Sequence, residues 1–290
     1  MWYIIYCQLT NVLIMKNFSL PFLVTLTITA ALALLPSCEQ QDEAVVPMAP
    51  PMTYTPVSDE VKAQFTRLQF DVSDIVKVGE NYLVEGDIMV TPVALKNMLT
   101  AHPVSVENGR TEQYRTYNLV SRSLSTIRIR PNNTSQRFLL AIDRAIYNYN
   151  QLGLTFRMVR VAANQPAEIT VRLSSGNNFL GSAGFPTGNG LPWNDVIIDV
   201  SAFNGDDDSA EETVTHEIGH CLGLRHSDWY DRSLSCGRGG NEGDGGVGAV
   251  GISGTVRFDS ESLMNSCGAI TSDPSGEFSY YDRIAIQNLY

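Results

Sequence analysis

The chain has 290 residues, of which 43% are hydrophobic and 18% are charged, so it can bury one substantial core. Its formal net charge of -11 excludes nucleic acid as an expected partner, because such binding depends on Lys and Arg side chains that neutralise phosphates. The acidity otherwise concerns solubility and says little about the substrate.

Residues 1–38 have the layout of an export signal. Met15-Lys16-Asn17 precedes an apolar run over 20–35, and Leu35-Pro36-Ser37-Cys38 follows. A basic stretch, an apolar segment and a small-residue cleavage point are typical of a signal peptide, and Met15 is the expected true start. The last four residues are similar to a bacterial lipobox, which predicts a lipid on Cys38; a plain signal peptide and an uncleaved anchor helix are the alternatives.

Two segments precede the expected catalytic domain. Residues 39–57 are acidic and rich in proline, which predicts a flexible tether. Residues 58–112 form an N-terminal extension or a propeptide-like unit. Within it we expect two helices, one through Val61, Phe65 and Leu68 and one after Pro92, with a strand over 82–90 between them.

Residues 113–290 are the expected catalytic domain. Alternating apolar residues predict strands over 124–130, 154–161, 167–173 and 195–200, and helical spacing predicts a helix over 134–152. A further helix begins at Ser209, with Glu212 in capping-box register. This order predicts an α/β (α+β) fold with a mixed, twisted sheet.

The helix that is predicted to begin at Ser209 leads into His216-Glu217-Ile218-Gly219-His220. His216 and His220 are four residues apart and share one helix face, where imidazole nitrogens can bind Zn²⁺. Glu217 lies about 100° further round the helix, where it can reach a zinc-bound water without binding the metal.

The third histidine of the motif is the more specific feature. On a continuous helix His226 would point away from the metal, so the chain must turn between His220 and His226. Gly223 lies in this interval and can adopt the left-handed conformation that ends a helix. Requiring this Gly and this His lowers the chance occurrence of the motif to about 1 in 100,000 chains at ordinary composition.

The elongated motif resembles that of the metzincin zinc peptidases, and Ser262-Leu263-Met264-Asn265 is similar to their downstream methionine turn. The residues 216–220 also spell the signature of the bacterial dual-action HEIGH metallopeptidases. The stretches 225–229, 241–243 and 251–255 are similar to that family.

The resemblance implies a metzincin-like fold, with an active-site helix and a C-terminal subdomain after the third histidine. It also implies one catalytic zinc on His216, His220 and His226, Glu217 as catalytic base, and Met264 packed beneath the histidines. Astacins and serralysins have a Tyr two residues after the turn Met, whereas this chain has Ser266. An oxyanion-assisting residue is therefore not identified.

Three further features have competing interpretations. Gly181, Ser182, Ala183 and Gly184 resemble the metzincin edge strand that pairs with substrate, although a plain Gly-rich loop is the alternative. Residues 206–208 are three aspartates, which form either an acidic helix N-terminus or a Ca²⁺ site. The Gly-rich segment 237–251 is expected to be a mobile insertion near the cleft.

Export implies an oxidising compartment, and the mature chain would carry Cys221, Cys236 and Cys267 besides Cys38. A bridge between Cys236 and Cys267 is the favoured pairing and would contribute roughly 3–4 kcal/mol. Three buried thiols are the alternative.

The sequence thus predicts an exported zinc endopeptidase that acts on peptide or protein substrates. It would meet the membrane only through a lipid anchor, as an outer-membrane or cell-surface lipoprotein of a Gram-negative bacterium, or would otherwise be extracellular. The alternative is a surface lipoprotein that binds glycan or protein and keeps zinc only as a structural ion.

Overall fold

The computed structural model describes residues 52–100, 113–271 and 275–290, which all belong to one compact unit. The predicted signal peptide, the predicted lipid site at Cys38 and the fourth histidine, His102, lie outside the described residues. Within the described part of the chain, no helix is long and apolar enough to cross a membrane.

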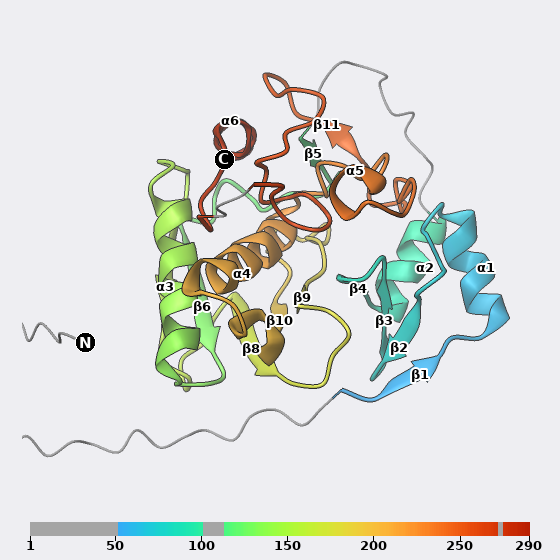
Figure 1. Ribbon diagram of the computed structural model, residues 1–290, viewed down its shortest axis with the longest axis horizontal. Helices are drawn as coiled ribbons and strands as arrows, with labels where there is room; N and C mark the ends of the chain where they lie inside the picture. The colour runs from blue at the N-terminus through green and yellow to red at the C-terminus, as the bar shows by residue number, and fades with distance from the viewer. Residues whose placement is uncertain (1–51, 101–112, 272–274) are drawn as a thin grey trace, which may run out of the picture. The chain divides into compact units, whose positions relative to one another are not determined.

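The N-terminal unit, residues 52–100, is a small antiparallel sheet covered by two helices (Figure 1). Its elements are β1 (Tyr54–Pro56), α1 (Asp59–Arg67), β2 (Val76–Val78), β3 (Asn81–Val84), β4 (Ile88–Val90) and α2 (Pro92–Thr100). Both predicted helices are present. The tether is shorter than predicted, because Tyr54–Pro56 pairs with β2 instead of remaining free.

The single strand predicted over 82–90 is wrong, because the structure has a hairpin there. Strands β3 and β4 pair antiparallel, with Val84 opposite Ile88. The three-residue turn between them contains Glu85 and Gly86, which have φ values of 61° and 99°. This turn changes the direction of the chain and carries Asp87 toward the histidine motif.

The expected catalytic domain, residues 113–290, is built on a five-stranded sheet in the order β7-β6-β8-β10-β9. Its strands are β6 (Thr126–Pro131), β7 (Arg157–Arg160), β8 (Ile169–Ser174), β9 (Gly181–Ser182) and β10 (Asp195–Asp199). Four strands run parallel, and β9 is antiparallel to β10 at the edge. The predicted α/β class with a mixed sheet is confirmed.

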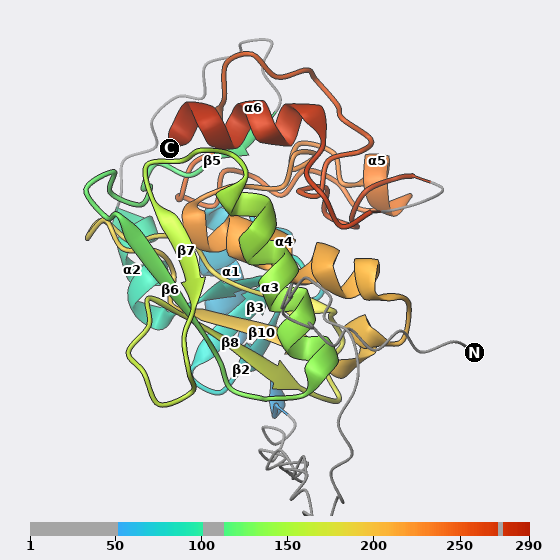
Figure 2. The ribbon, with the colours of Figure 1, turned by 90° about the vertical axis from the view of Figure 1, so that its left-hand side faces the viewer.

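Helices α3 (Gln136–Asn150) and α4 (Asp207–Leu222) lie side by side on one face of this sheet (Figures 1 and 2). Their apolar faces form the main core with the strands, through side chains such as Phe138, Ile142, Val214 and Ile218. The predicted start of the second helix is wrong. Asp206 caps it by accepting the Ser209 N–H, so the helix begins two residues before Ser209.

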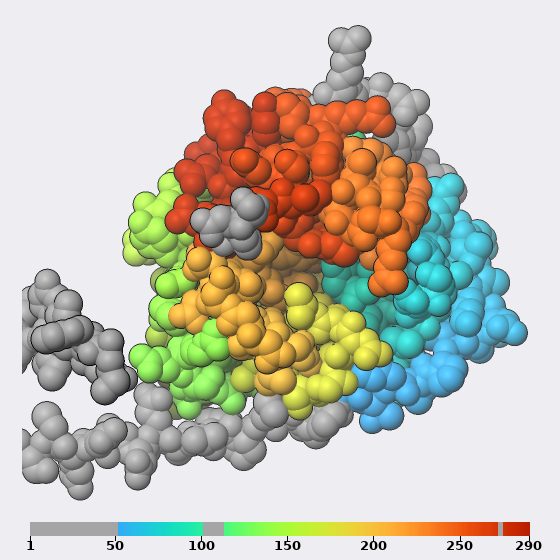
Figure 3. All heavy atoms as spheres, in the orientation of Figure 1, coloured from blue at the N-terminus to red at the C-terminus, as the bar shows by residue number. Residues whose placement is uncertain are grey.

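A C-terminal subdomain follows α4, as predicted. It contains α5 (Ser233–Cys236), β11 (Val250–Gly251) and α6 (Tyr280–Leu289), and β11 pairs with β5 (Tyr114–Arg115). In the space-filling view, teal atoms of the N-terminal unit lie between the yellow segment and the orange segment of the catalytic domain (Figure 3). Three residues of this unit, Glu85, Gly86 and Asp87, line a cleft together with residues of both segments.

Candidate metal centre and active site

Helix α4 places two histidines side by side. His216 and His220 lie one turn apart, and their ring centroids are 4.7 Å from each other. The side chain of His220 is fully buried and His216 is 8% exposed. Helical periodicity alone places the two side chains on the same face of α4.

The third histidine arrives through the predicted glycine turn. Gly223 is the left-handed C-cap of α4 with φ 101°, and the Leu224 N–H donates to the Gly219 carbonyl. The returning chain is held by a hydrogen bond from the Arg225 N–H to the Tyr114 carbonyl. His226 then lies 4.8 Å from His220 and 5.3 Å from His216 between ring centroids.

Each of the three imidazoles has its Nδ1 atom next to an oxygen acceptor. His216 Nδ1 lies 2.6 Å from the Leu263 carbonyl, and His220 Nδ1 lies 2.8 Å from the Leu224 carbonyl. His226 Nδ1 lies 2.6 Å from Glu242 Oε1. Protons on the three Nδ1 atoms satisfy these contacts, so each imidazole in its neutral form would present its Nε2 lone pair to a metal.

The Nε2 atoms fit a metal ion. His220 Nε2 is buried and has no hydrogen-bond partner, which is costly unless a ligand fills the space. Burial and the charges of His216 and His226 hold the pKa of His220 well below its usual range, which favours the neutral form that binds metal. Potential ligand atoms of the three histidines and Asp87 all lie within 4.8 Å of one another.

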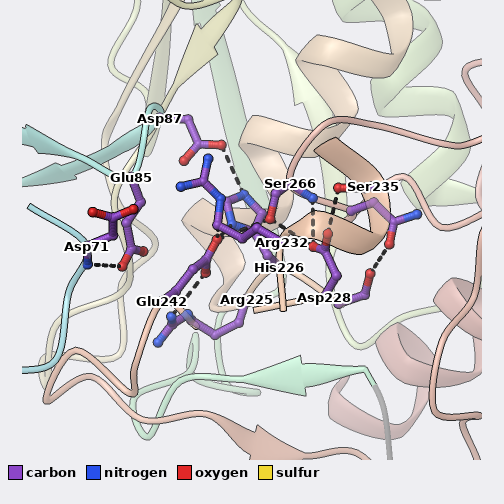
Figure 4. A network of polar contacts seen from close by, with 12 residues as sticks. Asp71, Glu85, Asp87, Arg225, His226, Asp228, Arg232, Ser235, Glu242 and Ser266 are labelled. Carbon is purple, nitrogen blue, oxygen red and sulfur yellow. Dashed lines mark hydrogen bonds and ion pairs between the residues drawn. The ribbon is translucent and has the colours of Figure 1, made fainter. Parts of the chain in front are cut away.

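Asp87 is the member of this cluster that the sequence did not predict. Its Oδ2 atom lies 2.9 Å from His226 Nε2 and 3.7 Å from His216 Nε2 (Figure 4). Burial alone would raise the pKa of Asp87, but the charge of His226, the hydrogen bond from His226 and the nearby His216 imidazole outweigh burial, so the pKa is well below its usual range. The available signal was Glu-Gly-Asp between two β-type runs, which is a hairpin pattern.

Glu217 is 2% exposed and lies beside the cluster without joining it. Its Oε2 atom is buried without a hydrogen-bond partner, and a Cβ on Gly181 would come 2.4 Å from Oε1. Burial, followed by the charge of Asp87, raises the pKa of Glu217 well above its usual range. Edge strand β9 therefore runs directly past this carboxyl, and only glycine fits there.

Glu242 supports the third histidine through a contact with its Nδ1 atom (Figure 4). It is fully buried, and it accepts hydrogen bonds from Arg225 at 3.3 Å and Ser266 at 3.1 Å besides its contact with His226. Burial raises its pKa, but the charge and hydrogen bond of His226 and the charge of Arg225 outweigh this and lower the pKa to about 2. The segment 237–251 was expected to be a mobile insertion, but its central part is packed around Glu242.

Met264 lies beneath the helix motif, as the resemblance implied. It is fully buried, and a Cβ on Gly219 would come 2.6 Å from its Sδ atom. Cys236 and Cys267 form a disulfide, and Cys221 is a buried free thiol.

The three aspartates for which a Ca²⁺ site was considered lie outside the metal centre. The aspartates 206–208 form the acidic N-terminus of α4, where Asp207 and Asp208 pair with Arg137 and Arg144. They are therefore engaged in capping and ion pairs. A cleft of about 440 Å³ borders His216 and Glu217, and its walls include Phe179, Leu180, Glu212, Thr213 and Ser266.

Residues 82–290 match the dual-action HEIGH metallo-peptidase family, so the chain belongs to this family and is a metallopeptidase. Among curated proteins, none matches the chain. Two solved structures of myroilysin are similar. One has 13% identity and a TM-score of 0.36, and covers 59% of this chain and 97% of its own; the other has 14% identity and a TM-score of 0.37, and covers 70% and 98%.

Proposed function

We propose that this metallopeptidase is a zinc-dependent endopeptidase, with the metal held by His216, His220 and His226 and with Glu217 as general base. The observation that carries the proposal is the convergence of three imidazole Nε2 atoms beside a buried carboxyl that has no partner of its own. An all-nitrogen set of three protein ligands is typical of catalytic zinc. A bound zinc ion would supply a Lewis acid that polarises the scissile carbonyl.

Glu217 moves the proton in this proposal. Its unpartnered Oε2 atom can accept a proton from the attacking water and can then donate it to the leaving amine. The raised pKa of the buried carboxyl suits this double role, because the proton must be held between the two steps. Substrate would lie extended along β9, whose backbone can pair with a peptide strand.

Two variants test the role of Glu217. Glu217→Ala should abolish casein hydrolysis while keeping about one zinc per chain, because the side chain is not a ligand. His220→Ala should lose both zinc and hydrolysis. If Glu217→Ala loses as much zinc as His220→Ala, the assignment of roles is wrong. If the zinc-loaded protein hydrolyses no casein with or without a chelator, the alternative is favoured, which is a binding lipoprotein that keeps zinc only as a structural ion.

We also propose that the protein is exported and anchored by a lipid on Cys38. The lipobox-like end of residues 1–38 supports this, and so does the Cys236–Cys267 disulfide, since such bonds persist in oxidising compartments. Cys38→Ser should release the protein from the membrane fraction. Unchanged partition into detergent would instead indicate an uncleaved N-terminal anchor.

A further inference from the structure

One basic side chain lies in the wall of the cleft that borders His216 and Glu217. Among the described residues, Arg232 is the only Lys or Arg that lines this cleft, and its side chain is 18% exposed. A Cβ on Gly239 would come 3.1 Å from Arg232 Cβ, and a Cβ on Gly86 would come 3.8 Å from Arg232 Nη2. The side chain therefore extends along the cleft wall, with its guanidinium next to the proposed catalytic centre.

The positive charge of Arg232 is only partly compensated. Arg225 and Arg232 share the carboxylate of Glu242, with N···O distances of 3.3 Å and 3.4 Å (Figure 4). Arg225 also donates to three main-chain carbonyls. For Arg232, the contact with Glu242 is the only ion pair within the described part of the chain, and the Nε atom is buried without a hydrogen bond. A guanidinium in this state can take a further anionic partner.

The acidic residues of the same cleft have donors of their own. Glu85 Oε1 accepts a hydrogen bond from the Asp71 N–H at 3.2 Å, and Glu212 Oε1 accepts one from the Ala269 N–H at 2.8 Å. Asp87 pairs with the histidines of the cluster. The terminal nitrogens of a guanidinium form a planar fork that binds a carboxylate through two parallel hydrogen bonds. A carboxylate that enters the cleft with a substrate therefore finds its matching group on Arg232.

The backbone around Arg232 is fixed on both sides. Its N–H donates to the Gly240 carbonyl at 3.0 Å, and its carbonyl accepts the Cys236 N–H at 2.9 Å. Cys236 is bonded to Cys267, which itself lines the cleft. A group that is held in place before binding loses less conformational freedom when the ligand arrives. The disulfide thus fixes the backbone that carries Arg232 to the cleft wall.

We propose that Arg232 makes this peptidase selective for substrates that have an Asp or Glu next to the cleaved bond, by pairing its guanidinium with the substrate carboxylate. The inference rests on the proposed function, because it takes His216 and Glu217 of the same cleft as parts of the catalytic centre. Arg232 selects the substrate and takes no part in the proton transfer by Glu217.

The test uses the zinc-loaded full chain and three variants. Arg232→Gln removes the charge, and Arg232→Glu reverses it. Arg238→Gln is the matched control, because Arg238 is an exposed arginine of the same segment that does not line the cleft. For each protein, kcat/KM is measured on peptides that differ only in having Glu, Gln or Lys at one position, which is moved along the peptide. Binding of the same peptides is measured by calorimetry with Glu217→Ala added to each protein.

We expect the wild type and Arg238→Gln to prefer the Glu peptide over the Gln peptide by at least about tenfold, the usual effect of a hydrogen bond to a charged group. Arg232→Gln should lose this preference and should still cleave the Gln peptide within about threefold of the wild type. Arg232→Glu should prefer the Lys peptide. The binding constants should follow the same order.

Equal cleavage and equal binding of Glu and Gln peptides by the wild type would overturn the inference. A uniform loss of kcat on all three peptides in Arg232→Gln, or a loss of zinc, would also overturn it, because Arg232 would then act on the reacting carbonyl or through Glu242. If the Glu peptide binds more tightly only when Arg232 is present, but the wild type cleaves no peptide, Arg232 stands as a carboxylate site and the proposed endopeptidase function fails.

Discussion

Glu242 offers the sharpest test of how the third histidine is held. Two of the three histidines are supported by main-chain carbonyls, which substitution cannot remove, whereas His226 is supported by a side chain. We expect Glu242→Gln to weaken zinc binding by about 10–100-fold, the usual effect of losing a partner of a metal ligand. In free energy this is about 1.4–2.8 kcal/mol.

The physical reason is the loss of a buried charge at 2.6 Å from Nδ1. The carboxylate makes the imidazole a stronger donor and fixes its tautomer, while a neutral amide gives a weaker hydrogen bond. Arg225 keeps the carbonyls of Gly243, Asp244 and Gly248 as acceptors, so the variant should remain folded.

Zinc affinity is measured by chelator competition, with far-UV circular dichroism as a check on folding. Glu261→Gln is the control, because it makes the same chemical change at an exposed position of the same subdomain. Glu242→Gln that is folded and binds zinc within about twofold of the wild type would refute the reasoning, because such a change is below about 0.5 kcal/mol.

Three other changes test the surroundings of the site. Gly223→Val should weaken zinc binding and activity together and leave α4 intact, because a Cβ at φ 101° costs about 1–2 kcal/mol before any clash. Gly181→Ala should lower kcat/KM by about tenfold or more at unchanged zinc content, since the new Cβ would displace Glu217, whose position decides proton transfer. Replacing Cys236 and Cys267 by Ser should lower the free energy of unfolding by about 3–4 kcal/mol for a separation of 31 residues, measured by urea denaturation.

Each of these three predictions can be contradicted by a specific result. Wild-type zinc affinity in Gly223→Val would mean that the turn tolerates a side chain. Gly188→Ala is the control for Gly181→Ala, because its Cβ would meet nothing closer than 3.9 Å, and equal activity of the two variants would contradict the steric argument. An unchanged urea midpoint in the double Ser variant would show that the disulfide does not stabilise the fold by reducing the conformational entropy of the unfolded chain.

The parts of the site that follow from local spacing were predictable from the sequence. His216 and His220 follow from helix periodicity, Gly223 follows from the need to reverse the chain, and the mixed sheet follows from the order of the elements. The helix start was wrong by two residues, because Asp206 and Ser209 are both good caps and only tertiary contacts decide between them.

The parts that depend on distant contacts were not predictable. Asp87 meets His226 across 139 positions of the chain, and no periodicity connects a hairpin turn to a histidine that far away. Ser266 illustrates the same limit. The sequence shows that Ser266 stands where similar families have a Tyr, but only the structure shows that its hydroxyl lies within hydrogen-bond distance of both Asp228 and Glu242.

Buried charge couples the metal site to Asp87. Burying an anion is costly unless a cation accompanies it. Burial raises the pKa values of Glu85 and Glu217, which lets these two carboxyls stay neutral, and Arg225 pairs with Glu242. Asp87 remains anionic, and its only ion-pair partners in the described part of the chain are His216 and His226. Burial lowers the pKa of His226, but the charges of Asp87 and Glu242 and their hydrogen bonds outweigh it and raise this pKa well above its usual range. A protonated His226 therefore balances Asp87 when no metal is bound, and a divalent cation among the imidazoles would take over this role.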